Sequence, residues 1–255
     1  KLINFSCFVF FIFYSMTSFA DKSFFKDISY LLPDQKPRLS YGVAVTDFDN
    51  DGLDEFIVTG FGYENLALGF DGKSLKNKIK ENIFSDFNRS TIGVAACDID
   101  KDGHEEIYFL NTDTYSGQKM YSDRLLNIEN KSIVDLFEKD INQDELNLTA
   151  GRSVVCVDRE GKGNYGVYVA NYGGPTRFYE YIEDRVVDLA ESLNLDEVTG
   201  GRAVVAGHIL TDQMDIFAAN ERGPNFLYFN KKGKFLDVAG QMNVRDMYQN
   251  GRGTA

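Results

Sequence analysis

The sequence predicts an all-β fold, a β-propeller of four-stranded blades. One pattern of segments recurs about every fifty residues, and each copy contains about four short strand-like runs separated by turn residues. A single four-stranded sheet cannot bury both of its faces, so the copies must pack together around an axis. A β-sandwich of irregular hairpins would not explain why strand, acidic loop, strand, Gly-Pro turn and strand return in the same order.

The first twenty residues differ in composition from the rest. The stretch from Leu2 to Met16 is almost wholly apolar and aromatic, and small residues at Ser18 and Ala20 suit cleavage by signal peptidase. This run is too short and wrongly flanked for a membrane span, and no later segment could cross a bilayer. We therefore predict a signal peptide over residues 1–20, an incomplete propeller over residues 21–255, and a secreted, extracellular protein.

The repeats begin near residues 41, 92, 152, 202 and 252. The four complete copies open with the small-residue strands Tyr41-Gly42-Val43-Ala44-Val45, Ile92-Gly93-Val94-Ala95-Ala96, Arg152-Ser153-Val154-Val155-Cys156 and Arg202-Ala203-Val204-Val205-Ala206. Small side chains suit the crowded innermost strand of a blade, and the aromatic strands that come later suit the layer between blades. The fifth copy contains only the beginning of its first strand, so we expect the natural protein to continue.

An acidic loop follows the opening strand in the first two copies. Calcium takes roughly six to eight oxygen ligands, and carboxylates at alternate positions of a short loop can surround one ion. The predicted ligands are carboxylates at loop positions 1, 3, 5 and 9 and the backbone carbonyl at position 7. In the first loop these are Asp47, Asp49, Asp51, Leu53 and Glu55, and in the second they are Asp98, Asp100, Asp102, His104 and Glu106.

The acidic loops have two alternative explanations, an EF-hand and a solvated turn without metal. An EF-hand requires a glutamate at position 12, where this chain has Val58 and Phe109, and strand-like residues rather than a helix follow each loop. Asp-Gly stretches also occur as solvated turns without metal, but two copies in register favour a metal site. The third loop has Lys162 at position 5 and the fourth has His208 at position 1, so we expect both to be metal-free.

Charge and cysteine content restrict the function further. The formal net charge of −12 disfavours nucleic acid and anionic membrane surfaces as partners. Cys97 and Cys156 remain after removal of the signal peptide, and both a disulfide between them and two buried free thiols stay open. Three Asn-x-Ser/Thr motifs predict glycan sites at Asn88, Asn130 and Asn147.

The blade pattern resembles the FG-GAP/VCBS repeat, the unit of integrin α-subunit propellers. Over residues 25–255 the chain also resembles the cartilage acidic protein 1 family. The segments that carry this resemblance include Ala96-Cys97-Asp98-Ile99-Asp100, Ala150-Gly151-Arg152-Ser153-Val154, Ala170-Asn171-Tyr172 and Gly223-Pro224-Asn225-Phe226-Leu227. The resemblance implies a secreted, calcium-binding glycoprotein of the extracellular matrix. It further implies a seven-bladed propeller followed by an ASPIC/UnbV region, with metal ligands at the carboxylates of the two acidic loops.

Three classes of function were compared. The preferred one is a non-catalytic interaction scaffold whose calcium ions stiffen blade loops and whose partner is an extracellular protein or matrix component. The alternative is the ectodomain of an integrin-α-like adhesion receptor or of a receptor ligand. A propeller hydrolase is less favoured, because the mature region has only His104 and His208, lacks a Gly-x-Ser-x-Gly motif and places its acidic clusters in the loops.

Overall fold

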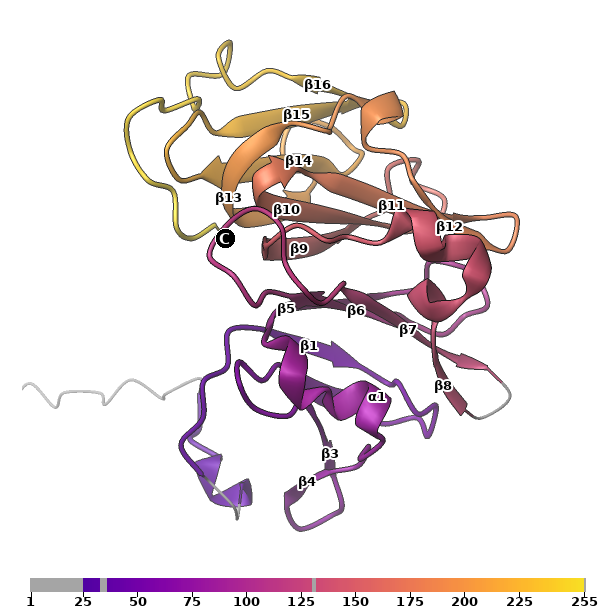
Figure 1. Ribbon diagram of the computed structural model, residues 1–255. Coiled ribbons are helices and arrows are strands. Elements are labelled where there is room, and N and C mark those ends of the chain that lie inside the picture. Colours follow the sequence, from indigo (N-terminus) through magenta and orange to yellow (C-terminus); the bar gives the residue numbers. More distant parts are fainter. Residues whose placement is uncertain (1–24, 33–35, 130–131, 255) are drawn as a thin grey trace, which may run out of the picture.

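The computed structural model describes residues 25–32, 36–129 and 132–254. The predicted signal peptide over residues 1–20 lies outside these ranges. Figure 1 shows successive four-stranded sheets stacked from β1–β4 at one end of the molecule to β13–β16 at the other. None of the helices in the described ranges has the length and apolar character needed to cross a bilayer.

Each sheet is an antiparallel meander in which every strand pairs with the next one along the chain. The first blade comprises β1 (Val43–Thr46), β2 (Glu55–Val58), β3 (Leu66–Phe70) and β4 (Leu75–Asn77). The second comprises β5 (Thr91–Cys97), β6 (Glu106–Asn111), β7 (Arg124–Glu129) and β8 (Ser132–Asp135). The third comprises β9 (Gly151–Val157), β10 (Gly166–Pro175), β11 (Arg177–Ile182) and β12 (Arg185–Asp188). The fourth comprises β13 (Val198–Gly207), β14 (Asp215–Asn220), β15 (Phe226–Lys231) and β16 (Lys234–Asp237).

The all-β propeller architecture with four-stranded blades is therefore confirmed. Short helical turns join some of the strands. They are the α-helix α1 (Asn82–Ser85) and the 3₁₀ turns η1 (Ser29–Leu31), η2 (Phe87–Arg89), η3 (Leu136–Glu138), η4 (Asp140–Glu145) and η5 (Glu191–Leu193). The total of seven blades in the natural protein stays a prediction.

The hydrophobic core lies between the blades, and the second strands of the second and third blades each contribute to two core layers. Alternate side chains of a strand point to opposite faces of the sheet. In β6, Ile107 and Phe109 pack with Phe84 on the side of the first blade, while Tyr108 and Leu110 pack with residues of the third. All six residues of β6 are buried, and its four central residues form a continuous apolar run between the polar Glu106 and Asn111.

The innermost strands β1, β5, β9 and β13 lie next to one another around the axis of the propeller. The first residue of each innermost strand follows the connection from the preceding blade, and its last residue precedes the loop to the second strand. Residues just before Val43 and around Arg152 therefore lie at one face of the molecule. The acidic loops that follow Thr46 and Cys97 lie at the opposite face.

The third and fourth blades are joined by direct strand pairing, which the sequence did not predict. The distal end of β10 pairs with the start of β13, with Tyr172 opposite Gly200 and Pro175 opposite Val198. A glycine lies at this approach, since a Cβ atom on Gly201 would lie 2.8 Å from the carbonyl oxygen of Asn171 on β10. The two blades thereby form one eight-stranded sheet.

Candidate metal centres

The first acidic loop folds around the side chain of Asp47. The carboxylate of Asp47 accepts hydrogen bonds from the backbone N–H groups of Asp51 (3.0 Å) and Gly52 (2.9 Å). The carboxylate of Asp51 accepts another from the N–H of Leu53 at 2.9 Å. Gly52 has a φ of +87°, a backbone conformation that glycine adopts without steric cost. The turn is thus held by the residues that the sequence predicts as ligands.

The second loop repeats this arrangement at the equivalent positions. The carboxylate of Asp98 accepts from the N–H of Gly103 at 3.1 Å, and that of Asp102 accepts from the N–H of His104 at 2.8 Å. Gly103 has a φ of +90°. Two loops of different sequence therefore adopt the same turn.

Three carboxylates converge in each loop. Oxygen atoms of Asp47, Asp49 and Glu55 lie within 4.8 Å of one another, as do those of the second trio, Asp98, Asp100 and Glu106. The glutamate of each trio begins the second strand of its blade, where pairing with the end of the innermost strand places it beside the loop. Oxygens with this spacing can share one calcium ion, whose bonds to oxygen are roughly 2.3–2.6 Å long.

The two glutamates are buried among other acidic groups. Glu55 is fully buried and Glu106 is 1% exposed. Burial, followed by the nearby aspartates Asp49, Asp51 and Asp47, raises the pKa of Glu55 to about 7. Burial also raises the pKa of Glu106 to about 8, against the opposing effect of a hydrogen bond from the N–H of Ile99.

The glutamate oxygens also lack hydrogen-bond partners. Neither carboxylate oxygen of Glu55 has a partner within the described residues, and Oε1 of Glu106 has none either. Only Oε2 of Glu106 is bonded, to the N–H of Ile99 at 2.8 Å. Buried carboxylates without partners are costly unless a cation neutralises them, so this donor set fits a hard divalent ion such as calcium.

The remaining predicted ligands lie near these trios but outside them. Asp51 and Asp102 do not belong to the converging carboxylates, and Oδ2 of Asp51 lies 3.5 Å from the ammonium nitrogen of Lys78. Leu53 and His104 contribute to the turns through their backbones. Ligation by these four residues stays a prediction.

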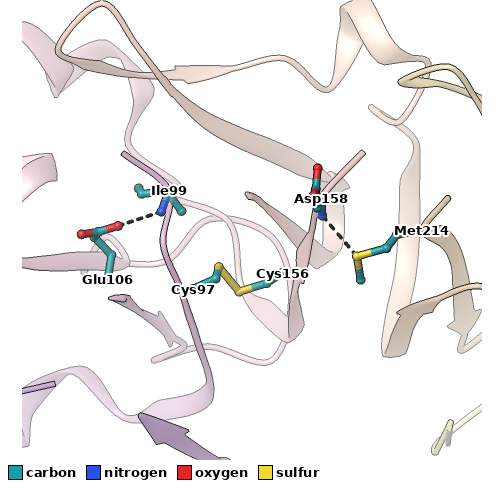
Figure 2. The surroundings of a disulfide bond; sticks show 6 residues. All are labelled: Cys97, Ile99, Glu106, Cys156, Asp158 and Met214. Atoms are coloured by element: carbon teal, nitrogen blue, oxygen red, sulfur yellow. Dashed lines mark hydrogen bonds between the residues drawn. A yellow bond between two sulfur atoms is a disulfide. The ribbon is translucent and has the colours of Figure 1, made fainter. Parts of the chain in front are cut away.

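A disulfide joins the second and third blades beside the second loop. Figure 2 shows the bond between Cys97 and Cys156. Cys97 directly precedes Asp98, and Cys156 lies two residues before Asp158. Their Cα atoms are 6.3 Å apart, although 59 residues separate them in the chain. Of the two alternatives that the sequence left open, the structure therefore has the disulfide. The bond fixes two innermost strands at the end where the loops begin.

Comparison with known proteins supports the same blade type. An FG-GAP-like repeat model matches residues 47–109, which contain both acidic loops. The chain is 42% identical to cartilage acidic protein 1 of Xenopus tropicalis over 244 residues, which are 86% of this chain and 38% of that protein. It is 41% identical to the Homo sapiens protein of the same name over 244 residues, covering 86% of this chain and 37% of that protein. The resemblance to the cartilage acidic protein 1 family is confirmed.

The chain spans somewhat more than a third of the length of these cartilage acidic protein 1 relatives. Among solved structures, BBS1N in complex with ARL6DN has a TM-score of 0.46 at 10% identity, covering 78% of this chain and 56% of that chain. The V. cholerae biofilm matrix protein Bap1 has a TM-score of 0.42 at 17% identity, covering 78% of this chain and 30% of that chain. Similarity at this level carries no functional argument.

The third blade keeps the loop turn of the family repeat but has lost the buried glutamate. The carboxylate of Asp158 accepts hydrogen bonds from the N–H groups of Lys162 (3.1 Å) and Gly163 (2.6 Å), as Asp47 and Asp98 do in their loops. Strand pairing makes Gly166 the counterpart of the two buried glutamates. A Cβ atom at Gly166 would lie 2.5 Å from the ring of Phe178, so no larger side chain fits there.

The fourth blade has a shorter loop and a different carboxylate arrangement. Pairing of β13 with β14 places Asp215 opposite Gly207, so Asp215 is the structural counterpart of the buried glutamates. The sequence does not reveal this equivalence, because the loop is one residue shorter and counting from His208 shifts the alignment. The Asp215 carboxylate accepts from the N–H groups of Asn230 (2.7 Å) and Leu210 (2.6 Å), so backbone donors satisfy it.

One predicted glycan site is wrong. Asn147 is fully buried, and its amide nitrogen donates to Asp123 at 2.6 Å and to Asn171 at 3.0 Å. A glycan requires an exposed asparagine, and this side chain belongs to a polar network between two blades. Asn88 is exposed and stays a predicted site, whereas Asn130 lies outside the described residues.

Proposed function

We propose that this chain belongs to a secreted, non-catalytic interaction scaffold of the extracellular matrix, in which calcium ions hold the loops of the first two blades. The observation that best supports calcium is the pair of buried glutamates. Glu55 and Glu106 each have unpartnered oxygens beside two aspartates, and each follows a turn that fits a calcium loop. A divalent cation would offset the mutual repulsion of these carboxylates.

The role of calcium under this proposal is structural. Sites in extracellular modules bind calcium with dissociation constants of roughly 10⁻⁴ to 10⁻³ M. At ten times the dissociation constant, one ion stabilises a folded protein by about 1.4 kcal/mol. A gain of this size holds a loop in place, and it suits a protein that remains in a calcium-rich environment.

Two further observations support an extracellular setting. The disulfide between Cys97 and Cys156 suits an oxidising compartment, where such bonds form and persist. The curated relatives carry the name cartilage acidic protein 1. On this basis the partner would be an extracellular protein or matrix component, and a glycan at Asn88 would lie on the surface of the propeller.

The calcium proposal is tested by thermal unfolding of the natural full-length protein with calcium and with a chelator. We expect calcium to raise the melting temperature, and we expect the double variant Asp49→Ala/Asp100→Ala to lose this increase. Asp212→Ala is a matched control, since Asp212 is an exposed aspartate of the fourth loop outside the carboxylate trios. An unchanged calcium effect in the double variant would refute both sites.

A further inference from the structure

A second candidate site lies at the face opposite the acidic loops, around the starts of the innermost strands. It is a cavity of about 580 Å³. Strand pairing places four of its lining residues at the same register position in successive blades. These are Tyr41, Ile92, Arg152 and Arg202. The repeat thus builds a cavity that is apolar on the side of the first two blades and cationic on the side of the next two.

Arg152 is a half-buried cation without an acidic partner. No carboxylate of the described chain lies within ion-pair distance of its guanidinium, although the protein carries a net charge of −12. The guanidinium donates to the carbonyl oxygens of Gly151 (3.1 Å) and Tyr115, and weakly to the hydroxyl of Thr112 at 3.4 Å. Its Nε–H is buried and has no acceptor among the described residues.

Arg202 lies beside Arg152 but has an acidic partner. Its guanidinium pairs with Glu221, which also lies 3.9 Å from Arg252. The ion pairs of this carboxylate are thus with two other arginines, and Arg152 feels its charge without an ion pair of its own. Burial and the nearby positive charge of Arg202 both lower the pKa of Arg152, consistent with two cations held close together.

Two tyrosines hold these arginines in place. The guanidinium carbons of Arg152 and Arg202 lie 5.1 and 5.5 Å from the centroid of the Tyr115 ring. They lie 5.6 and 5.4 Å from the centroid of Tyr172. The hydroxyl of Tyr115 also accepts a hydrogen bond from Arg202 at 2.8 Å. Stacking on aromatic faces fixes a guanidinium while leaving its N–H groups available, so both cations are oriented before a ligand arrives.

The opposite wall of the cavity is apolar. Tyr41 packs edge to face against Phe61, with ring centroids 5.4 Å apart, and Ile92 continues this surface. The one acidic residue among those that line the cavity is Asp113. Oxygen Oδ2 of Asp113 accepts from the N–H groups of Met120 (2.8 Å) and Tyr121 (3.0 Å), so this carboxylate is engaged by backbone.

We propose that this cavity binds an organic carboxylate joined to an apolar group, presented by a partner protein as an acidic residue next to an aromatic or aliphatic one. The carboxylate pairs with the positive charge of the Arg152 guanidinium, and the apolar group lies against Tyr41, Phe61 and Ile92. The proposal rests on the scaffold role and deepens it by naming the chemistry of a partner. The carboxylate site lies at the starts of the innermost strands, whereas the proposed calcium sites lie in loops at the opposite face.

The test uses the natural full-length protein and two small probes, 3-phenylpropionate and its neutral amide, 3-phenylpropionamide. We expect saturable binding of the carboxylate by calorimetry or by ligand-observed NMR, and at least tenfold weaker binding of the amide. Arg152→Gln should weaken carboxylate binding by tenfold or more. Arg185→Gln is a matched control, because Arg185 is an exposed arginine on β12 of the same blade. The comparison of the two probes on the unaltered protein stands even if Arg152→Gln fails to fold.

Peptide probes then distinguish a protein partner from a small metabolite. An acetylated and amidated Phe-Asp-Phe peptide should bind more tightly than its Phe-Asn-Phe analogue, with the same loss in Arg152→Gln. Equal binding of acid and amide, or unchanged carboxylate binding in Arg152→Gln, overturns the site. Binding of 3-phenylpropionate but not of the acidic peptide overturns the protein partner. If calcium fails to stabilise the protein while the carboxylate still binds, the calcium proposal falls and this one stands.

Discussion

Asn50 in the first acidic loop meets His104 in the second across the boundary between two blades. The amide nitrogen of Asn50 lies 2.7 Å from Nδ1 of the imidazole ring. Each residue belongs to the turn around one carboxylate trio, since Asn50 lies between Asp49 and Asp51 while His104 follows Asp102. The two acidic loops are therefore in direct contact through side chains.

This contact predicts energetic coupling between the two calcium sites. An ion that orders one loop should favour the ordered form of the other, by a factor of about five or less because the contact is exposed. We expect Asp49→Ala to remove the first site and also to weaken the second a few fold. Asn50→Ala should keep two sites but remove the coupling, as measured by calorimetric calcium titration. A second site with unchanged affinity in Asp49→Ala would show that the loops act independently.

A pH dependence follows from the raised pKa of Glu106. In the metal-free folded protein Glu106 stays protonated up to about pH 8, whereas in the unfolded chain it loses its proton near its ordinary pKa of 4.5. The contribution of Glu106 to the free energy of unfolding is therefore fully present below pH 4.5 and is lost as the pH rises toward 8. In chelator, Glu106→Gln should be more stable than the parent protein near pH 8 and nearly equal to it well below pH 4.5. Thermal unfolding of both proteins across this range checks the sign.

Near pH 8, calcium should make the parent protein more stable than Glu106→Gln, the reverse of their order in chelator. The ion binds the ionised carboxylate and competes with the proton, so calcium stabilisation should grow as the pH rises. Glu106→Gln should lose the calcium effect contributed by the second loop. A calcium effect that is independent of pH in the parent protein would contradict ligation by Glu106.

Replacing Lys162 should not turn the third loop into a calcium site. Lys162→Asp restores a carboxylate at loop position 5, but Gly166 still stands where the first two blades have a buried glutamate. Adding Gly166→Glu should destabilise the protein, since its side chain would collide with Phe178. Calorimetry should therefore detect no additional site in Lys162→Asp. An extra calcium ion bound by this single variant would show that the buried glutamate is dispensable.

Loss of the disulfide should destabilise the protein substantially. The bond closes a loop with a sequence separation of 59 residues, for which chain entropy predicts about 4 kcal/mol of stabilisation. Urea unfolding of Cys97→Ser/Cys156→Ser should show a loss of this order, and reduction of the parent protein should reproduce it. If the reduced protein kept the stability of the oxidised one, the bond would be incidental to the fold.

The sequence predicts the blades well because each depends on local patterns. Small residues before an acidic loop and an apolar run after it are enough to place strands such as β5 and β6. The sequence does not predict the pairing of β10 with β13, because that pairing depends on close approach of Gly201 to the backbone of Asn171 in another blade.

The candidate sites were predicted less completely, for a similar reason. The carboxylates of the two loops are neighbours in sequence and could be found by spacing alone. Burial of Asn147 depends on Asp123 and Asn171, which are far from it along the chain, so its motif gave the wrong prediction. The lack of an ion pair for Arg152 likewise appears only when blades that are distant in sequence are placed side by side.

The shared sheet of the third and fourth blades also affects how the molecule opens. Strand pairing connects β12 through β10 and β13 to β16, with two paired positions between β10 and β13, whereas β1–β4 and β5–β8 form separate sheets. Transient opening of either of the last two blades must break bonds that belong to the other, so the pair opens as one cooperative unit. The backbone amides of their central strands should exchange with solvent deuterium slowly and at similar rates, while those of the first blade should exchange faster and independently.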